Sequence, residues 1–118
     1  LTIQDCLTAY LVTVLNRCQE RPIRMVTNAA SYRNVTAPFV EANVAGNAIQ
    51  NIVAEQLPSD VVGIATAIRT SINRSRDAQD LENWLSTASD CMLGTINSGK
   101  SFFFRAHDEV LTVNSNSS

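Results

Sequence analysis

The segment from Gly94 to Ser101 carries the residue pattern most suggestive of chemistry. It reads Gly-Thr-Ile-Asn-Ser-Gly-Lys-Ser, in which two glycines with four residues between them are followed by lysine and serine. In a phosphate-binding loop of this pattern, backbone N–H groups surround the phosphates, the lysine reaches the β and γ oxygens, and the serine hydroxyl binds magnesium. The candidate nucleotide-binding residues are therefore Gly94, Gly99, Lys100 and Ser101.

The surroundings of this segment argue against nucleotide binding. A phosphate-binding loop follows a buried parallel strand and opens a helix, whereas residues 77–96 show the apolar spacing of a helix. Only 17 residues follow Ser101, too few for the strand–helix units that a parallel sheet requires. A glycine at 94 or 99 is better explained as the C-cap of that helix. Nucleotide binding at 94–101 is kept only as an alternative function.

Other combinations of reactive side chains are sparse. Cys91 and His107, the single histidine, form a conceivable nucleophile and base, but Asp108 is the sequence neighbour of His107 and is poorly placed to orient it. The sequence has no Cys-x-x-Cys motif and no Cys/His cluster of the kind that binds zinc. We predict a protein without enzymatic activity, metal or cofactor.

The three cysteines, Cys6, Cys18 and Cys91, are candidates for a disulfide. On one helix, Cys6 and Cys18 would lie about 18 Å apart, beyond the Cα separation of about 7 Å that a disulfide tolerates. An internal disulfide must therefore use Cys91, with Cys6 if the two helices are antiparallel or with Cys18 if they are parallel. We expect a disulfide and favour Cys6 as the partner. The alternative is three buried thiols that act as small apolar residues.

The cysteines and the start of the chain at Leu1 predict an extracellular protein. Three Asn-x-Ser/Thr sequons, at Asn34, Asn73 and Asn116, permit glycosylation without requiring it. No apolar run reaches the length of about 18 residues that a membrane-spanning helix needs.

Apolar side chains recur at helical spacing along most of the chain. Thr2 and Asp5 have the arrangement of a capping box before a first helix that reaches Cys18. Ser59 or Asp60 caps a later helix, and Asp77 opens the one after it, with acidic residues in its first turns that suit the helix dipole. The further predicted helices cover residues 22–33, 39–57, 61–72 and 77–96. These segments predict an all-α, compact bundle of about five helices, followed by a short segment over 101–113 whose pattern fits a helix or a strand.

Length and composition agree with one folded unit. The chain has 118 residues, of which 45% are hydrophobic and 17% charged, with a formal net charge of −2. The apolar fraction is too high for a disordered chain, and the slightly acidic balance argues against a nucleic-acid binder. We predict a single helical domain over 1–113 and a polar frayed tail over 114–118.

An uncharged polar stripe suggests how this domain functions. Asn43, Asn47 and Asn51 recur every four residues and would share one face of the helix expected at 39–57. Amides are less costly to desolvate than charges, so these three are candidate interface residues. The predicted function is a secreted, non-enzymatic interaction or self-association module that binds another protein or forms a homo-oligomer.

A second function remains open at this point, namely carriage of an apolar small molecule in a cavity between the helices. The side chains that would line it are Tyr10, Met25, Phe39, Trp84 and Met92.

Overall fold

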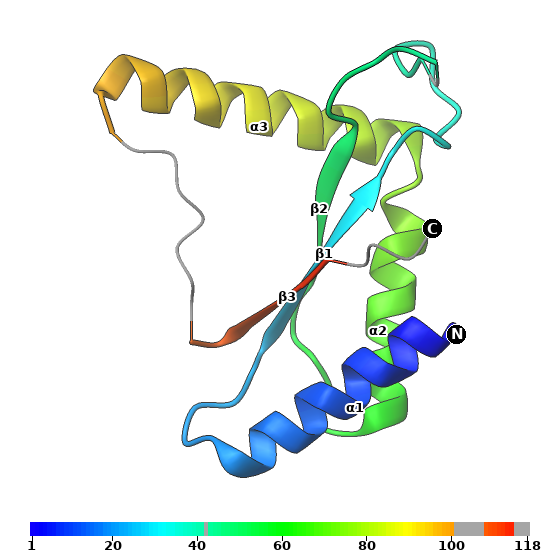
Figure 1. The fold of residues 1–118 in the computed structure, drawn as a ribbon, viewed down its shortest axis with the longest axis vertical. Coiled ribbons are helices and arrows are strands. Elements are labelled where there is room, and N and C mark those ends of the chain that lie inside the picture. Colours follow the sequence, from blue (N-terminus) through cyan, green and yellow to red (C-terminus); the bar gives the residue numbers. More distant parts are fainter. Residues whose placement is uncertain (42, 101–107, 115–118) are drawn as a thin grey trace.

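The described part of the chain folds as three helices and a three-stranded mixed sheet. The computed structural model describes residues 1–41, 43–100 and 108–114. The elements in chain order are α1 (Ile3–Cys18), β1 (Met25–Ser31), β2 (Ile49–Ala54), α2 (Val61–Arg74), α3 (Ala78–Ser98) and β3 (Val110–Asn114). The strand order is β2-β1-β3, with β2 antiparallel and β3 parallel to the central strand (Figure 1). The prediction of an all-α bundle of about five helices is therefore wrong, and the fold is α/β.

Three of the predicted helices are present, and the caps of the first two are residues that the sequence indicated as caps. Thr2 and Asp5 form the capping box of α1. The Asp60 carboxylate accepts a hydrogen bond from the Gly63 N–H at the start of α2, and Asp77 accepts from two N–H groups at the start of α3. These side chains satisfy helix donors that would otherwise lack a partner.

The helices predicted over 22–33 and 39–57 are not formed. The first segment contains β1, in which Val26 and Asn28 are buried and their neighbours are more exposed. The second contains the end of a loop and then β2, where burial also alternates from residue to residue. Gly46 has a φ of 154°, far from the helical value of about −63°. A short run of apolar residues fits a half-buried strand as well as a helix, and here the strand forms.

The core lies between one face of the sheet and helices α1 and α2. Its buried side chains are Ala9, Val12, Ile23, Val26, Ala54, Ile64, Ala65 and Ile68. Two polar contacts tie the elements to this core. Asn16, near the end of α1, accepts from the Ile23 N–H at 2.6 Å, and the Gln50 amide of β2 donates to the Ser75 carbonyl at 3.3 Å. The first bond joins α1 to the segment that leads into β1, and the second joins β2 to the end of α2.

Helix α3 extends away from this core, and its position removes the expected disulfide. Leu81 is its one fully buried residue among those described, and α3 runs along the end of the molecule opposite α1 (Figure 1). Cys6, Cys18 and Cys91 are all exposed and free. The predicted disulfide of Cys91 with Cys6 or Cys18 is wrong, because α1 packs against α2 and not against α3. The extracellular prediction loses this support.

Candidate functional site

The outer edge of β2 is an unpaired strand edge. Tyr32 donates its N–H to the Ala48 carbonyl at 2.9 Å, just beyond the end of the β1–β2 ladder. Residues of an antiparallel pair alternate between hydrogen-bonded and non-bonded positions. Ile49, Asn51 and Val53 therefore hold the positions whose N–H and C=O groups point away from β1. No hydrogen bond found among the described residues reaches these outward groups.

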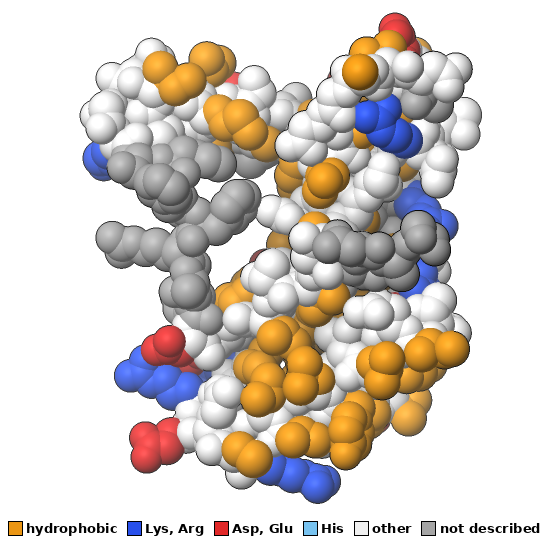
Figure 2. Space-filling model, viewed as in Figure 1, with side chains coloured by type: hydrophobic (Ala, Val, Ile, Leu, Met, Phe, Trp, Pro, Cys, Tyr) orange, Lys and Arg blue, Asp and Glu red, His pale blue; other side chains and the backbone are white. Residues whose placement is uncertain are grey.

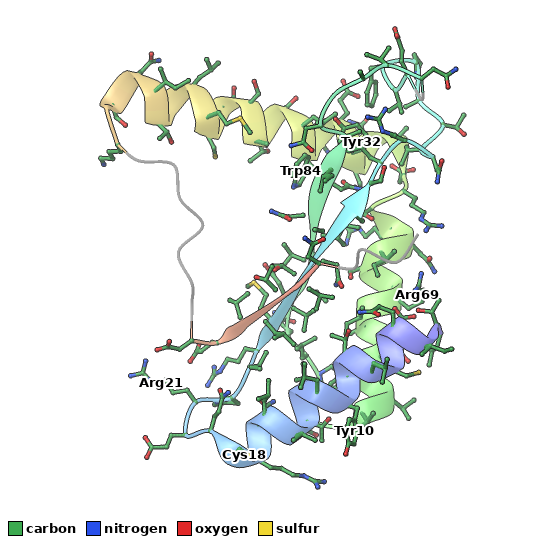
Figure 3. The ribbon with its side chains drawn as sticks, in the orientation of Figure 1. Tyr10, Cys18, Arg21, Tyr32, Arg69 and Trp84 are labelled. Atoms are coloured by element: carbon green, nitrogen blue, oxygen red, sulfur yellow. The ribbon has the colours of Figure 1, made fainter. Side chains whose placement is uncertain are left out.

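A groove runs beside this edge, and we refer to it as the β2 groove. It has a volume of about 820 Å³, with residues 50–54 of β2 as one wall. Its floor comes from α2 and includes the small residues Gly63, Ala67 and Thr70, while Asp80 and Trp84 of α3 close one end. Figure 3 shows Trp84 extending from α3 beside β2. The groove thus places small side chains next to a row of unpaired backbone donors and acceptors.

Gly63 is required by the local packing of the groove floor. A Cβ at this position would lie 2.6 Å from an Asp60 carboxylate oxygen and 2.9 Å from the Pro58 Cβ. The absence of a side chain lets Asp60 cap α2 and lets Pro58 lie close to the helix. The end of β2 and the start of α2 are therefore held in a fixed relation.

Strand β2 lacks the features that usually protect an edge from other chains. Its sequence, Ile-Gln-Asn-Ile-Val-Ala, contains no charged residue and no proline. Natural sheets discourage edge pairing with lysines, prolines, bulges or covering segments. On the sheet face opposite the helices, Ile49 and Val53 are 53% and 41% exposed. The edge is chemically suited to accept another strand.

The three predicted interface asparagines do not form a stripe. Asn43 and Asn47 are exposed in the loop between β1 and β2, and only Asn51 lies in a strand, where it is half-buried and lines the β2 groove. The predicted stripe required a helix over 39–57, which is absent. Sequence reasoning therefore included one residue of the candidate site, for a reason that the fold does not support. The β-branched Ile49, Ile52 and Val53 were the available signal for a strand.

The phosphate-loop pattern forms the end of a helix. Gly94 lies within α3, and Gly99 is its C-cap with a left-handed φ of 66°. This confirms the explanation of Gly99 as a cap. The N–H of Gly99 donates to the Ile96 carbonyl, so that group is already used. Lys100 follows the cap, while Ser101 and His107 lie outside the described residues. A strand followed by a phosphate loop is not formed here.

The aromatic and methionine side chains proposed to line a common cavity are dispersed. Trp84 lines the β2 groove. Phe39 lies in the loop after β1, Tyr10 on the exposed side of α1, and Met92 on the far half of α3, each substantially exposed. The bundle interior that the carrier prediction required is not present.

Two helices also carry uncovered apolar side chains. On α1 these are Ile3, Leu7, Tyr10 and Leu11. Figure 2 shows hydrophobic side chains at the surface over the region of α1, and Figure 3 shows Tyr10 on the outer side of that helix. On the second half of α3 they are Met92, Leu93 and Ile96. Exposed apolar patches often mark interaction surfaces. Unlike the edge of β2, these faces present no row of directional groups that would select an occupant.

One buried ion pair joins the start of α1 to the middle of α2. The Asp5 carboxylate is 1% exposed and accepts two hydrogen bonds from Arg69, each 2.8 Å long. It also accepts from the Thr2 N–H at 2.6 Å. Burial alone would raise the pKa of Asp5, but the Arg69 and Thr2 hydrogen bonds outweigh it and hold the pKa below its usual value of 3.8. Both Asp5 carboxylate oxygens and the Nε and Nη2 groups of Arg69 are hydrogen-bonded, so we assign the pair a role in holding α1 on α2; Figure 3 shows Arg69 beside α1.

Asn28 of β1 is a buried polar residue whose side-chain amide is not fully hydrogen-bonded. It is 8% exposed, and its Nδ2 has no hydrogen-bond partner. Asn28 lies opposite Ile52 of β2 and Val113 of β3, on the face that the helices cover. An unpaired buried amide lowers stability by roughly 1–3 kcal/mol. It does not face the β2 groove, and we assign it no part in the candidate site.

Within ranges 1–41, 43–100 and 108–114, no group of three or more His, Cys, Asp or Glu side chains is placed to hold a metal ion. In the same part of the chain, no helix has the length and apolar character needed to cross a membrane. Comparison of the chain with protein-family models, with curated proteins and with solved structures finds no match.

Proposed function

We propose that this chain is a non-enzymatic self-association module that binds a second copy of itself through the open edge of β2. The observation that carries the proposal is the row of outward backbone groups at Ile49, Asn51 and Val53, beside a groove floored by small residues. Strand addition of this kind obtains affinity from main-chain hydrogen bonds and specificity from neighbouring side chains.

A second copy is favoured as the occupant because β2 is complementary to itself. The strand carries no charge, so two copies meet without electrostatic repulsion. Of the three charged side chains that line the groove, Arg74 and Asp80 form an ion pair of 3.1 Å, and Glu55 lies just beyond the end of β2. A strongly charged partner would find no unmatched group of opposite sign in β2 itself. The exposed Ile49 and Val53 favour an uncharged, β-branched strand, and β2 is one.

Replacing Val53 with lysine is expected to weaken self-association about tenfold or more. Val53 is exposed and points away from the core, so the fold tolerates the change. The new ammonium group would interrupt the apolar contact between two adjoining edges, as edge lysines do in natural sheets. Sedimentation velocity over a wide range of protein concentration measures the effect.

Two matched variants locate the interface. Leu7→Lys on α1 and Leu93→Lys on α3 also replace an exposed aliphatic side chain with lysine, at positions that are 59% and 56% exposed. We expect both to associate like the unmodified chain. Dissociation caused by either of them, with no effect of Val53→Lys, would place the interface on a helix. A chain that is monomeric at every concentration would refute self-association itself.

A further inference from the structure

The alternation of hydrogen-bonding positions along β2 also defines how two copies would pair. We propose that the two β2 strands pair antiparallel about a two-fold axis at Asn51, an inference that rests on the proposed self-association. Each Asn51 then lies opposite Asn51 of the second copy, and the two three-stranded sheets become one continuous sheet.

An isologous dimer presents the same patch from both subunits, and antiparallel pairing is somewhat more stable per residue than parallel pairing. The outward groups of Ile49, Asn51 and Val53 must face outward groups of the second copy to form hydrogen-bonded pairs. In the proposed register, Ile49 faces the second copy's Val53, Asn51 faces Asn51, and Val53 faces Ile49. Each pair exchanges two hydrogen bonds, about six in all. A shift by two residues leaves one outward residue of each β2 without a facing strand residue.

The side chains fit the same register. Ile49 and Val53 lie on the sheet face that the helices leave open, and each would pack against the other across the new interface. Cross-strand pairs of β-branched residues stabilise antiparallel sheets. Between them, the Asn51 amide has both a donor and an acceptor, so two such amides on the axis can bond to each other. A single polar residue at the centre of an apolar contact is a known way to fix register.

The β2 groove provides room for this arrangement. With the two-fold axis perpendicular to the sheet, both α2 helices lie on the same side of the joined sheet and approach one another across the axis. The groove-facing positions of α2 include Gly63, Ala67 and Thr70, whose small side chains allow a close approach. The second copy's β2 and α2 would fill the space that the groove leaves open.

Disulfide trapping tests the register directly. In a variant whose native cysteines are all replaced by serine, Asn51→Cys should cross-link under mild oxidation. The Cα atoms of a hydrogen-bonded antiparallel pair are about 5.5 Å apart, within the range that a disulfide spans. Val53→Cys is the matched control, because its counterpart in the second copy is four residues away along the strand, about 13 Å. We expect at least tenfold more cross-linked dimer from Asn51→Cys.

A mixture of Ile49→Cys and Val53→Cys chains provides the second measurement. These residues face one another in the proposed register, so the mixture should yield a heterodisulfide that neither variant forms with itself. Equal or faster cross-linking of Val53→Cys alone would overturn the register. The cysteine-free chain could dimerise in sedimentation while its Asn51→Cys variant does not cross-link. That outcome would refute the register but not self-association. Absence of any dimer would refute the proposed function as well.

Discussion

Asp5→Ala is expected to lower the free energy of unfolding by about 3 kcal/mol or more, because removing one partner of a buried ion pair typically has an effect of this size. The Asp5 carboxylate is 1% exposed and accepts both Arg69 hydrogen bonds. Alanine would leave the Arg69 guanidinium, whose side chain is 23% exposed, without its carboxylate. It would also remove half of the capping box at the start of α1. Most folded domains are stable by only about 5–15 kcal/mol, so this loss would be readily measured.

Asp60→Ala is the matched control for this prediction. Asp60 also caps a helix, with a hydrogen bond of 2.7 Å from the Gly63 N–H, but it is exposed and has no arginine among its hydrogen-bond partners. Loss of such a cap costs about 1 kcal/mol. Urea denaturation at a fixed protein concentration should show a clearly larger effect for Asp5→Ala. Equal effects of the two variants would show that the ion pair with Arg69 adds nothing beyond capping.

The same carboxylate makes stability depend on pH in a defined direction. The pKa of Asp5 in the folded chain lies below its usual value of 3.8 because the Arg69 and Thr2 hydrogen bonds outweigh the effect of burial. Its contribution is fully present above that usual value and is lost as the pH falls through the lower, folded-state pKa. The difference in unfolding free energy between the unmodified chain and Asp5→Ala should therefore shrink in strong acid. A difference that stays constant would contradict the ionised pair.

The helices were predictable because the signals that start them are local. Thr2, Asp60 and Asp77 each lie within three residues of the N–H groups that they cap. The strands depend on partners far along the chain, since Met25 of β1 pairs with Val110 of β3. The inward positions of β1 are Val26, Asn28 and Ala30, and only the first is strongly apolar. Its alternation was therefore too weak to distinguish a strand from a helix.

The candidate site was not predictable for a related reason. An edge exists only once the order of the strands is known, and the order β2-β1-β3 depends on those distant pairings. Asn51 was selected because it was expected to share a helix face with Asn43 and Asn47, whereas it lies at the open edge of a sheet. The spacing of the asparagines drew attention to Asn51, but the strand edge on which it lies is defined by the fold alone.

Ile68→Ala tests whether the small core between the sheet and two helices carries the stability of the molecule. Ile68 is 1% exposed and belongs to the cluster that joins α1, α2 and the sheet. Its truncation removes buried apolar contact and leaves a cavity, which costs about 2–5 kcal/mol. We expect a value near 3 kcal/mol by urea denaturation. The measurement is best made on Val53→Lys as the parent, so that association does not contribute to the apparent stability.

Val62→Ala is the control on the same helix. Val62 lies in the first turn of α2 and is 68% exposed, so its truncation should change the unfolding free energy by no more than about 0.5 kcal/mol. A small effect of Ile68→Ala, similar to that of Val62→Ala, would mean that α2 is not packed on the sheet as described. The residues of α2 that line the β2 groove, such as Ala67 and Thr70, lie on a different face of this helix from Ile68. Loss of α2 packing would remove the groove together with the core, and the proposed dimer with it.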